Sequence, residues 1–278
     1  MSRTTVGDLF ERYRAGTPLT SLTAYDAPTA RLVDGSGVDM ILVGDSAGNV
    51  QLGYDSTLPV TLEEALSNTA AVSRAVSDAM VIGDMPFLSY GTSMEASVHN
   101  AGRFLKEADA DAVKLETAPH GDTTIDIIDR LTELGIPVQG HIGYTPQREH
   151  ELGGAVIQGS DRERSANVDD LVTTAERLVN AGVFSLVVET VTERTAKAVT
   201  EAIDVPTIGI GAGRYVDGQV LVINDVIGLG GSQYTFTKQY ADLDRVIADA
   251  VEAYVEDVRS GAFPTEAHAF EPLPDATQ

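Results

Sequence analysis

The chain has 278 residues, of which 43% are hydrophobic, and it carries 42 acidic against 19 basic side chains, a net charge of −23. It contains no cysteine, which excludes disulfides, thiolate chemistry and cysteine-ligated zinc or iron–sulfur sites. The negative charge argues against nucleic-acid and anionic-membrane partners, and no run of about 18 apolar residues occurs, so we predict a soluble, cytoplasmic protein.

Short apolar runs alternate with helix-length segments along the chain, which indicates a parallel sheet with crossover helices. A first helix near residues 6–13 has an apolar face and is expected to pack across a barrel bottom or against a neighbour. Eight runs in a chain near the ~250 residues of a (β/α)₈ barrel predict that α/β fold. The expected strands are 19–24, 40–43, 80–83, 112–115, 138–141, 185–188, 207–210 and 220–223.

Two further helices have clear boundary signals. Segment 62–76 follows Thr61 and has two acids in its first turn, which suit a helix N-terminus. Residues 246–258 carry apolar side chains at helical spacing, followed by glycine and proline. We predict one domain over residues 1–270, a barrel with an N-terminal helix, and a disordered tail over 271–278.

Polar side chains stand where the expected strands end, which is where such barrels place their reactive groups. Four carboxylates gathered there would repel one another, and a divalent cation would relieve the repulsion. Oxygen ligands favour magnesium (Mg²⁺) over zinc. The strand-end residues are Asp45, Ser46, Asp84, Lys114, Glu116, His141 and Glu189.

Each of these features has an alternative interpretation. An acid after a strand is often only a helix N-cap or a turn former. Lys114 could form a buried ion pair with Glu116 or another acid, and His141 is more often a hydrogen-bonded structural residue than a ligand. The glycine run 208–213 reads G-x-G-x-G, which favours a tight turn over a dinucleotide site.

Seven short motifs occur in one order along the chain, and together they resemble the ketopantoate hydroxymethyltransferase (3-methyl-2-oxobutanoate hydroxymethyltransferase) family from about residue 5 to residue 268. The resemblance implies a TIM barrel of the phosphoenolpyruvate/pyruvate superfamily type. The motifs are TAYD at 23–26, VGDS at 43–46, DSTLPVT at 55–61, DMPF at 84–87, VKLE at 113–116, GHIGYTPQ at 140–147 and IGIGAG at 208–213.

The resemblance also implies a reaction. A hydroxymethyl group passes from 5,10-methylenetetrahydrofolate to 3-methyl-2-oxobutanoate through a Mg-stabilised enolate. The product is 2-dehydropantoate, on the route to pantothenate and coenzyme A. Family members commonly form homo-oligomers, often decamers.

By the same resemblance, each subunit holds one Mg²⁺ and binds the oxo acid beside it. Glu189 is the expected catalytic proton acceptor, and His141 is a possible neighbour of the ligands. The implied metal ligands are Asp45, Asp84 and Glu116, and the implied substrate contacts are Asp45, Ser46, Asp84 and Lys114.

The chain departs from the family pattern in two places. After Gly153 and Gly154, family members commonly carry basic residues that are missing here from 155–160. A common Pro-Lys-Phe is replaced by Tyr-Thr-Phe at 234–236. These losses of positive charge concern how the one-carbon donor is held, and they do not touch the proton acceptor.

Two other functions remain open. One is another metal-dependent 2-oxo-acid C–C lyase or mutase of the same superfamily, and the missing cysteine counts against a lyase. The other is a non-catalytic barrel that only binds, although such a protein has no need for a repulsive ring of carboxylates. The acids are spread along the chain, which is typical of a folded halophilic protein whose self-repulsion is screened by salt.

Overall fold

The computed structural model describes residues 3–231 and 234–270, and its centre is a closed barrel of eight parallel strands in chain order. Each strand pairs with the next, and β1 closes the ring against β8. The predicted (β/α)₈ fold is therefore confirmed. The strands are β1 Leu19–Thr23, β2 Met40–Val43, β3 Met80–Asp84, β4 Ala112–Glu116, β5 Val138–Gly143, β6 Ser185–Glu189, β7 Thr207–Ile210 and β8 Gly218–Leu221.

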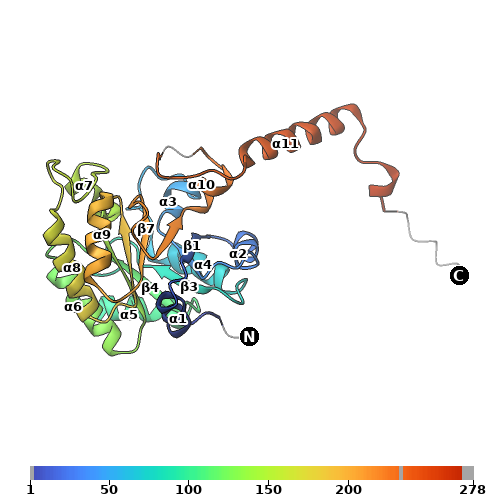
Figure 1. Cartoon of the computed structure of the whole chain (residues 1–278). Coiled ribbons are helices and arrows are strands. Elements are labelled where there is room, and N and C mark those ends of the chain that lie inside the picture. The colour runs from blue at the N-terminus through green and yellow to red at the C-terminus, as the bar shows by residue number, and fades with distance from the viewer. Residues whose placement is uncertain (1–2, 232–233, 271–278) are drawn as a thin grey trace, which may run out of the picture. The chain divides into compact units, whose positions relative to one another are not determined.

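Helices α5, α6, α8 and α9 lie outside the strands (Figure 1). The inner faces of these helices pack on the strands. For example, the ring of Phe104 in α5 occupies the space that a side chain at Gly83 of β3 would need. Among the described residues, no helix is long and apolar enough to cross a membrane. The helices are α1 Val6–Arg14, α2 Ala27–Asp34, α3 Ala47–Val50, α4 Leu62–Ser73, α5 Met94–Lys106, α6 Asp122–Glu133, α7 Glu149–Leu152, α8 Val168–Asn180, α9 Glu193–Ala202, α10 Ile223–Ile227 and α11 Leu243–Ser260, with 3₁₀ turns η1 Pro146–Arg148 and η2 Glu266–His268.

The last strand differs most from its predicted position. Strand β8 begins at Gly218, which pairs with Leu19 of β1 so closely that a Cβ at this glycine would crowd the Leu19 carbonyl. Ile223, predicted as the strand end, instead begins α10, and its N–H donates to Thr23 Oγ1 at 3.0 Å. The prediction from the apolar run 220–223 placed this strand two residues too late. The barrel closes through Gly218, and a glycine does not contribute to a hydrophobic pattern.

Helix α1 covers the N-terminal ends of the strands. It begins with a capping box in which Thr5 and Asp8 satisfy each other's backbone N–H groups. Leu9 is fully buried in a cluster with Leu19 and Met40, the first residues of β1 and β2. Of the two packing sites predicted for this helix, it occupies the one across the bottom of the barrel.

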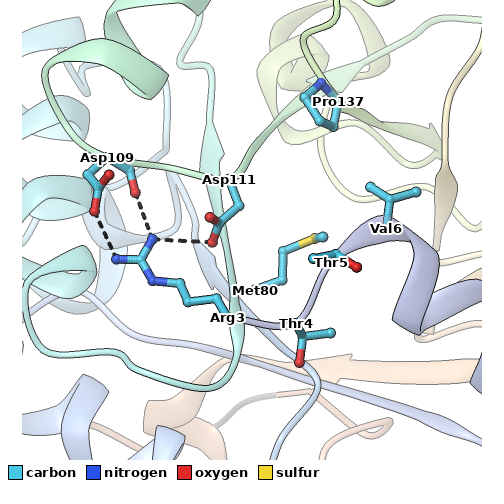
Figure 2. Close-up of a pocket in the computed structure, with 8 residues that line it drawn as sticks. All are labelled: Arg3, Thr4, Thr5, Val6, Met80, Asp109, Asp111 and Pro137. Carbon is cyan, nitrogen blue, oxygen red and sulfur yellow. Dashed lines mark hydrogen bonds and ion pairs between the residues drawn. The ribbon is translucent and has the colours of Figure 1, made fainter. Parts of the chain in front are cut away.

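Arg3 fixes the segment before α1 to the same end of the barrel. Its guanidinium donates to Asp109 at 3.0 Å, to Asp111 at 3.3 Å and to the Ser73 carbonyl at 2.6 Å. Figure 2 shows this cluster beside a cavity of about 540 Å³. Because the strands begin here, we assign the cluster to stability rather than chemistry.

The end of the chain forms a separate compact unit that comprises residues 224–231 and 238–270 of the described part. Its main element is α11, which begins after Asp242 and ends at Ser260, before Gly261 with a φ of 75°. The predicted helix is thus confirmed. The single domain over 1–270 stays a prediction, and the predicted tail 271–278 lies outside the described residues.

Replacement of Leu9 by alanine tests the role of α1. The substitution leaves a cavity under the barrel and should lower the free energy of unfolding by about 2–5 kcal/mol. The matched control is Leu32→Ala, because Leu32 is 75% exposed and should change stability by less than about 0.5 kcal/mol. Urea denaturation at fixed KCl measures both, and equal effects would contradict the packing of α1.

Candidate active site

A buried ion pair joins the ends of two neighbouring strands. Asp84 ends β3 and lies in register with Lys114 of β4, and the lysine Nζ donates to Asp84 Oδ1 at 2.6 Å. Burial alone would lower the pKa of Lys114, but the charges of Asp84, Glu116 and Asp45 outweigh it and raise the pKa. Lys114 is therefore charged at neutral pH, and its partner is Asp84 rather than Glu116.

The VGDS motif brings the end of β2 to the same place. The Asp45 N–H donates to Asp84 Oδ2 at 3.1 Å. A Cβ on Gly44 would lie 2.7 Å from Ser46 Oγ and 3.8 Å from Asp84 Oδ2, so only glycine leaves room here. Ser46 Oγ lies 2.8 Å from the hydroxyl of Tyr25, a residue in the loop after β1.

Asp45 shows how crowded the negative charge is. Burial, followed by the charge of Asp84, raises its pKa to about 7, although Lys114 and Gln147 oppose the shift. A divalent cation beside these carboxylates would reverse the shift, because it favours the ionised form. The oxygen donors and their excess of charge therefore fit Mg²⁺.

Gln147 is a site residue that sequence reasoning did not single out, although it closes the GHIGYTPQ motif. Its Nε2 donates to Asp45 Oδ2 and to the Met85 carbonyl, both at 3.0 Å. Its backbone N–H donates to Glu116 Oε2 at 3.0 Å. One residue thus connects two of the three acids that were predicted to hold the metal.

Tyr90 supports Gln147 from the loop after β3. Its hydroxyl donates to Gln147 Oε1 at 2.8 Å and accepts from the Glu116 N–H at 3.1 Å. Burial, together with the nearby carboxylates, raises the pKa of Tyr90 well above its usual value, so it stays a neutral donor. The amide of Gln147 is therefore held in one orientation.

His141 lies between two acids at the end of β5. Its Nε2 is 3.3 Å from Glu189 Oε2, and its Nδ1 is 3.7 Å from Glu116 Oε1. Neither nitrogen makes a hydrogen bond of good geometry within the described part of the chain. Burial lowers the pKa of His141 well below its usual value, so the ring is neutral.

Glu189 ends β6 and completes the group. Burial raises its pKa to about 8, while the charge of Lys114 opposes the shift and that of Asp84 adds to it. A carboxylate with a pKa near neutrality can both accept and release a proton at working pH. The structure thus brings all seven predicted residues to one end of the barrel.

The predicted ligand roles are a separate matter. Among residues 3–231 and 234–270, no three carboxylate or imidazole side chains are grouped closely enough to form a metal site by themselves. Mg²⁺ commonly takes one or two protein carboxylates and completes its shell with water and substrate. The assignment of Asp45, Asp84 and Glu116 as ligands remains a prediction.

The glycine run 208–213 begins inside β7 and forms a turn after the strand ends at Ile210. Gly211 and Gly213 have φ values of 61° and 78°, which side-chain-bearing residues rarely adopt. A Cβ at Gly213 would lie 2.8 Å from Glu193 Cγ of α9. These conformations favour the tight-turn interpretation of the run over a dinucleotide site.

The sequence has close relatives. A sequence model of the family described as Ketopantoate hydroxymethyltransferase matches residues 3–266. A 3-methyl-2-oxobutanoate hydroxymethyltransferase of Halobacterium salinarum is 55% identical over 252 residues, covering 91% of this chain and 90% of the relative. One from Thermoanaerobacter is 47% identical over 258 residues, covering 92% of both.

Solved structures with low sequence identity share the fold. Phosphonopyruvate hydrolase in complex with oxalate and Mg²⁺ has a TM-score of 0.60 at 13% identity, over 96% of this chain and 92% of that one. A 2,3-dimethylmalate lyase of the PEP mutase/isocitrate lyase superfamily has a TM-score of 0.61 at 14% identity, over 97% and 89%. At this identity, the likeness extends to the barrel alone.

Gln147→Leu should destabilise the protein. Leucine fills a similar volume but leaves Asp45 Oδ2 and the Met85 carbonyl without their donor, at about 1–3 kcal/mol for each buried group. Thermal and urea unfolding measure the loss. Gln51→Leu is the control because Gln51 is exposed after α3, and equal stability of the two variants would rule out the connecting role of Gln147.

Proposed function

The chain belongs to the ketopantoate hydroxymethyltransferase family, and from this premise we propose that the residues at its strand ends deprotonate 3-methyl-2-oxobutanoate and present the resulting enolate to a one-carbon donor. The protein is an enzyme, a transferase that moves a hydroxymethyl group to 3-methyl-2-oxobutanoate. Membership in this family also removes the non-catalytic barrel from consideration.

The observation that carries the proposal is the buried Lys114–Asp84 pair among three further carboxylates. The charge of Lys114 would attract the carboxylate of the oxo acid and offset the negative charge that develops on its 2-oxo oxygen. Ser46 is only half-buried, so its hydroxyl can also contact the substrate. In this arrangement, Asp45 and Asp84 border both the metal and the oxo acid.

The metal ligands in this proposal are Asp45, Asp84 and Glu116. Mg²⁺ bound there would act as a Lewis acid toward the carboxylate and 2-oxo oxygens of the substrate. Gln147 and Tyr90 keep Asp45 and Glu116 in fixed positions before any ligand arrives. This preorganisation lowers the cost of ordering the site when the substrate binds.

Glu189 is the proposed proton acceptor. It takes the C3 proton of the oxo acid, while the electron pair of the C–H bond moves into the enolate. C3 then forms a bond to the one-carbon unit, and one water supplies the hydroxyl oxygen, while both bonds from that carbon to the donor's two nitrogens break. The proton taken from C3 and the one released by the water end on those two nitrogens. Neutral His141 lies 3.3 Å from the proposed base, on the neighbouring strand.

The remaining assignments rest on family likeness. They are 5,10-methylenetetrahydrofolate as donor, 2-dehydropantoate as product, a place in pantothenate and coenzyme A biosynthesis, a cytoplasmic location and a ring of identical subunits. Adaptation to high salt is supported by the −23 charge, which is spread over the chain.

A lyase or mutase of the same superfamily is the competing activity, since several solved barrels of similar shape bear such names. Deuterium exchange separates the two. With 3-methyl-2-oxobutanoate and Mg²⁺ in D₂O, the transferase should exchange deuterium at C3 without any donor. Activity on isocitrate with no such exchange would overturn the proposed reaction.

The exchange rate should depend on the ionisation of Glu189. Because burial raises its pKa to about 8, the base is mainly protonated below that pH, and exchange should increase as the pH rises through it. Glu189→Gln cannot accept a proton and should reduce exchange by about 10²-fold or more. Glu193→Gln, on the exposed first turn of α9, is the control, and wild-type exchange in the Glu189 variant would assign the base elsewhere.

Metal binding can be measured without turnover. Mn²⁺ titrated by calorimetry should bind Asp45→Asn at least about tenfold more weakly than wild type, because one charged ligand is lost while the acceptor for Gln147 remains. Asp26→Asn is the matched control, since Asp26 follows β1 but serves as the N-cap of α2. Equal Mn²⁺ affinity in all three proteins would exclude Asp45 as a ligand.

A further inference from the structure

A second cavity lies beside the candidate active site, under the loop between β5 and α8. Its volume is about 250 Å³, and its lining includes Gly143, Arg148, Gln158 and Arg164. This loop contains the stretch 155–160, which carries no lysine or arginine. The positive charge at the cavity therefore comes from the two arginines that line it.

The walls of this cavity share backbone with the proposed base. Gly143 lies in register with Glu189, and a Cβ on this glycine would overlap the Glu189 carbonyl. The Gln158 N–H donates to the carbonyl of Thr190, the residue after the base, at 2.9 Å. A ligand in the cavity would therefore lie next to the strand end that carries Glu189.

Arg164 is held over the cavity in an unusual conformation. Its φ is 65°, a left-handed value that is costly for a residue with a Cβ. Its Nη1 donates to the Leu152 carbonyl at 3.3 Å and occupies the space that a side chain at Gly153 would fill. Gly153 itself has a φ of 71°, so the local backbone is built around this guanidinium.

Of the two arginines that line the cavity, Arg164 is the one that forms no ion pair within the described part of the chain. The other arginine, Arg148, is paired with Glu151 through two bonds. The lining acid Asp170 is bound by Asn167 at 2.7 Å and lies 3.4 Å from His120. Within the described part of the chain, no carboxylate lies within 4 Å of the Arg164 guanidinium, although the chain has 42 acids.

We propose that this cavity binds a carboxylate at the tail of the one-carbon carrier, with Arg164 as its charged partner. The inference rests on the proposed function, which requires a folate-type donor beside Glu189. An arginine with free N–H groups suits a carboxylate, because its planar donors can engage both oxygens. Arg164 would then supply the positive charge that the stretch 155–160 of the same loop does not.

Steady-state kinetics with 5,10-methylenetetrahydrofolate test this role. Arg164→Gln should raise the KM for the donor about tenfold, the loss expected for one charged hydrogen bond. Arg164→Lys should recover part of the affinity, because it keeps the charge. The KM for 3-methyl-2-oxobutanoate should not change, and neither should deuterium exchange at its C3, since these need no donor.

Arg162→Gln is the matched control. Arg162 lies two residues earlier in the same loop, is exposed and does not line the cavity, so its KM for the donor should equal that of wild type. An unchanged donor KM in Arg164→Gln overturns the inference. Equal effects of the two variants, or a parallel loss of exchange, also overturn it, whereas absence of exchange in the wild-type enzyme overturns the proposed function itself.

Discussion

The ion pair between Lys114 and Asp84 is the interaction on which the rest of the barrel mouth depends. Both side chains are almost fully buried, and moving two charges out of water is costly unless their geometry and further partners offset the loss. Here the lysine Nζ and the Asp84 oxygen are 2.6 Å apart, and the second Asp84 oxygen accepts the Asp45 N–H. Both oxygens of Asp84 are therefore paired, and these contacts connect the ends of three consecutive strands.

One lysine cannot neutralise the acids around it. Burial raises the pKa of Asp45 and Glu116, while the charge of Lys114 opposes the shift in both. The fold holds these carboxylates together through uncharged groups, the amide of Gln147 and the hydroxyl of Tyr90. Such groups fix the positions of the acids without cancelling their negative charge.

The sequence predicts which strands end in acids but not how those acids are connected. Asp84 and Glu116 can be assigned to one end because parallel strands share a direction. The bond between Gln147 and Asp45 joins residues 102 positions apart and exists only once the barrel has closed. The β8 boundary was missed for a related reason, since Gly218 is selected by its fit against Leu19 rather than by hydrophobicity.

The acids differ in their access to water, and this difference agrees with the separate roles proposed for them. The side chains of Asp84 and Glu116 are 2% and 3% exposed, whereas that of Glu189 is 19% exposed. A ligand for a metal must be held in position, which burial among hydrogen-bond donors promotes, and a bound cation would itself favour the ionised form. A base must also return its proton to solvent in every turnover, which requires some contact with water. Of these three acids, Glu189 meets the requirement of the proposed base, and its strand end lies beside Gly143, which lines the cavity together with Arg164.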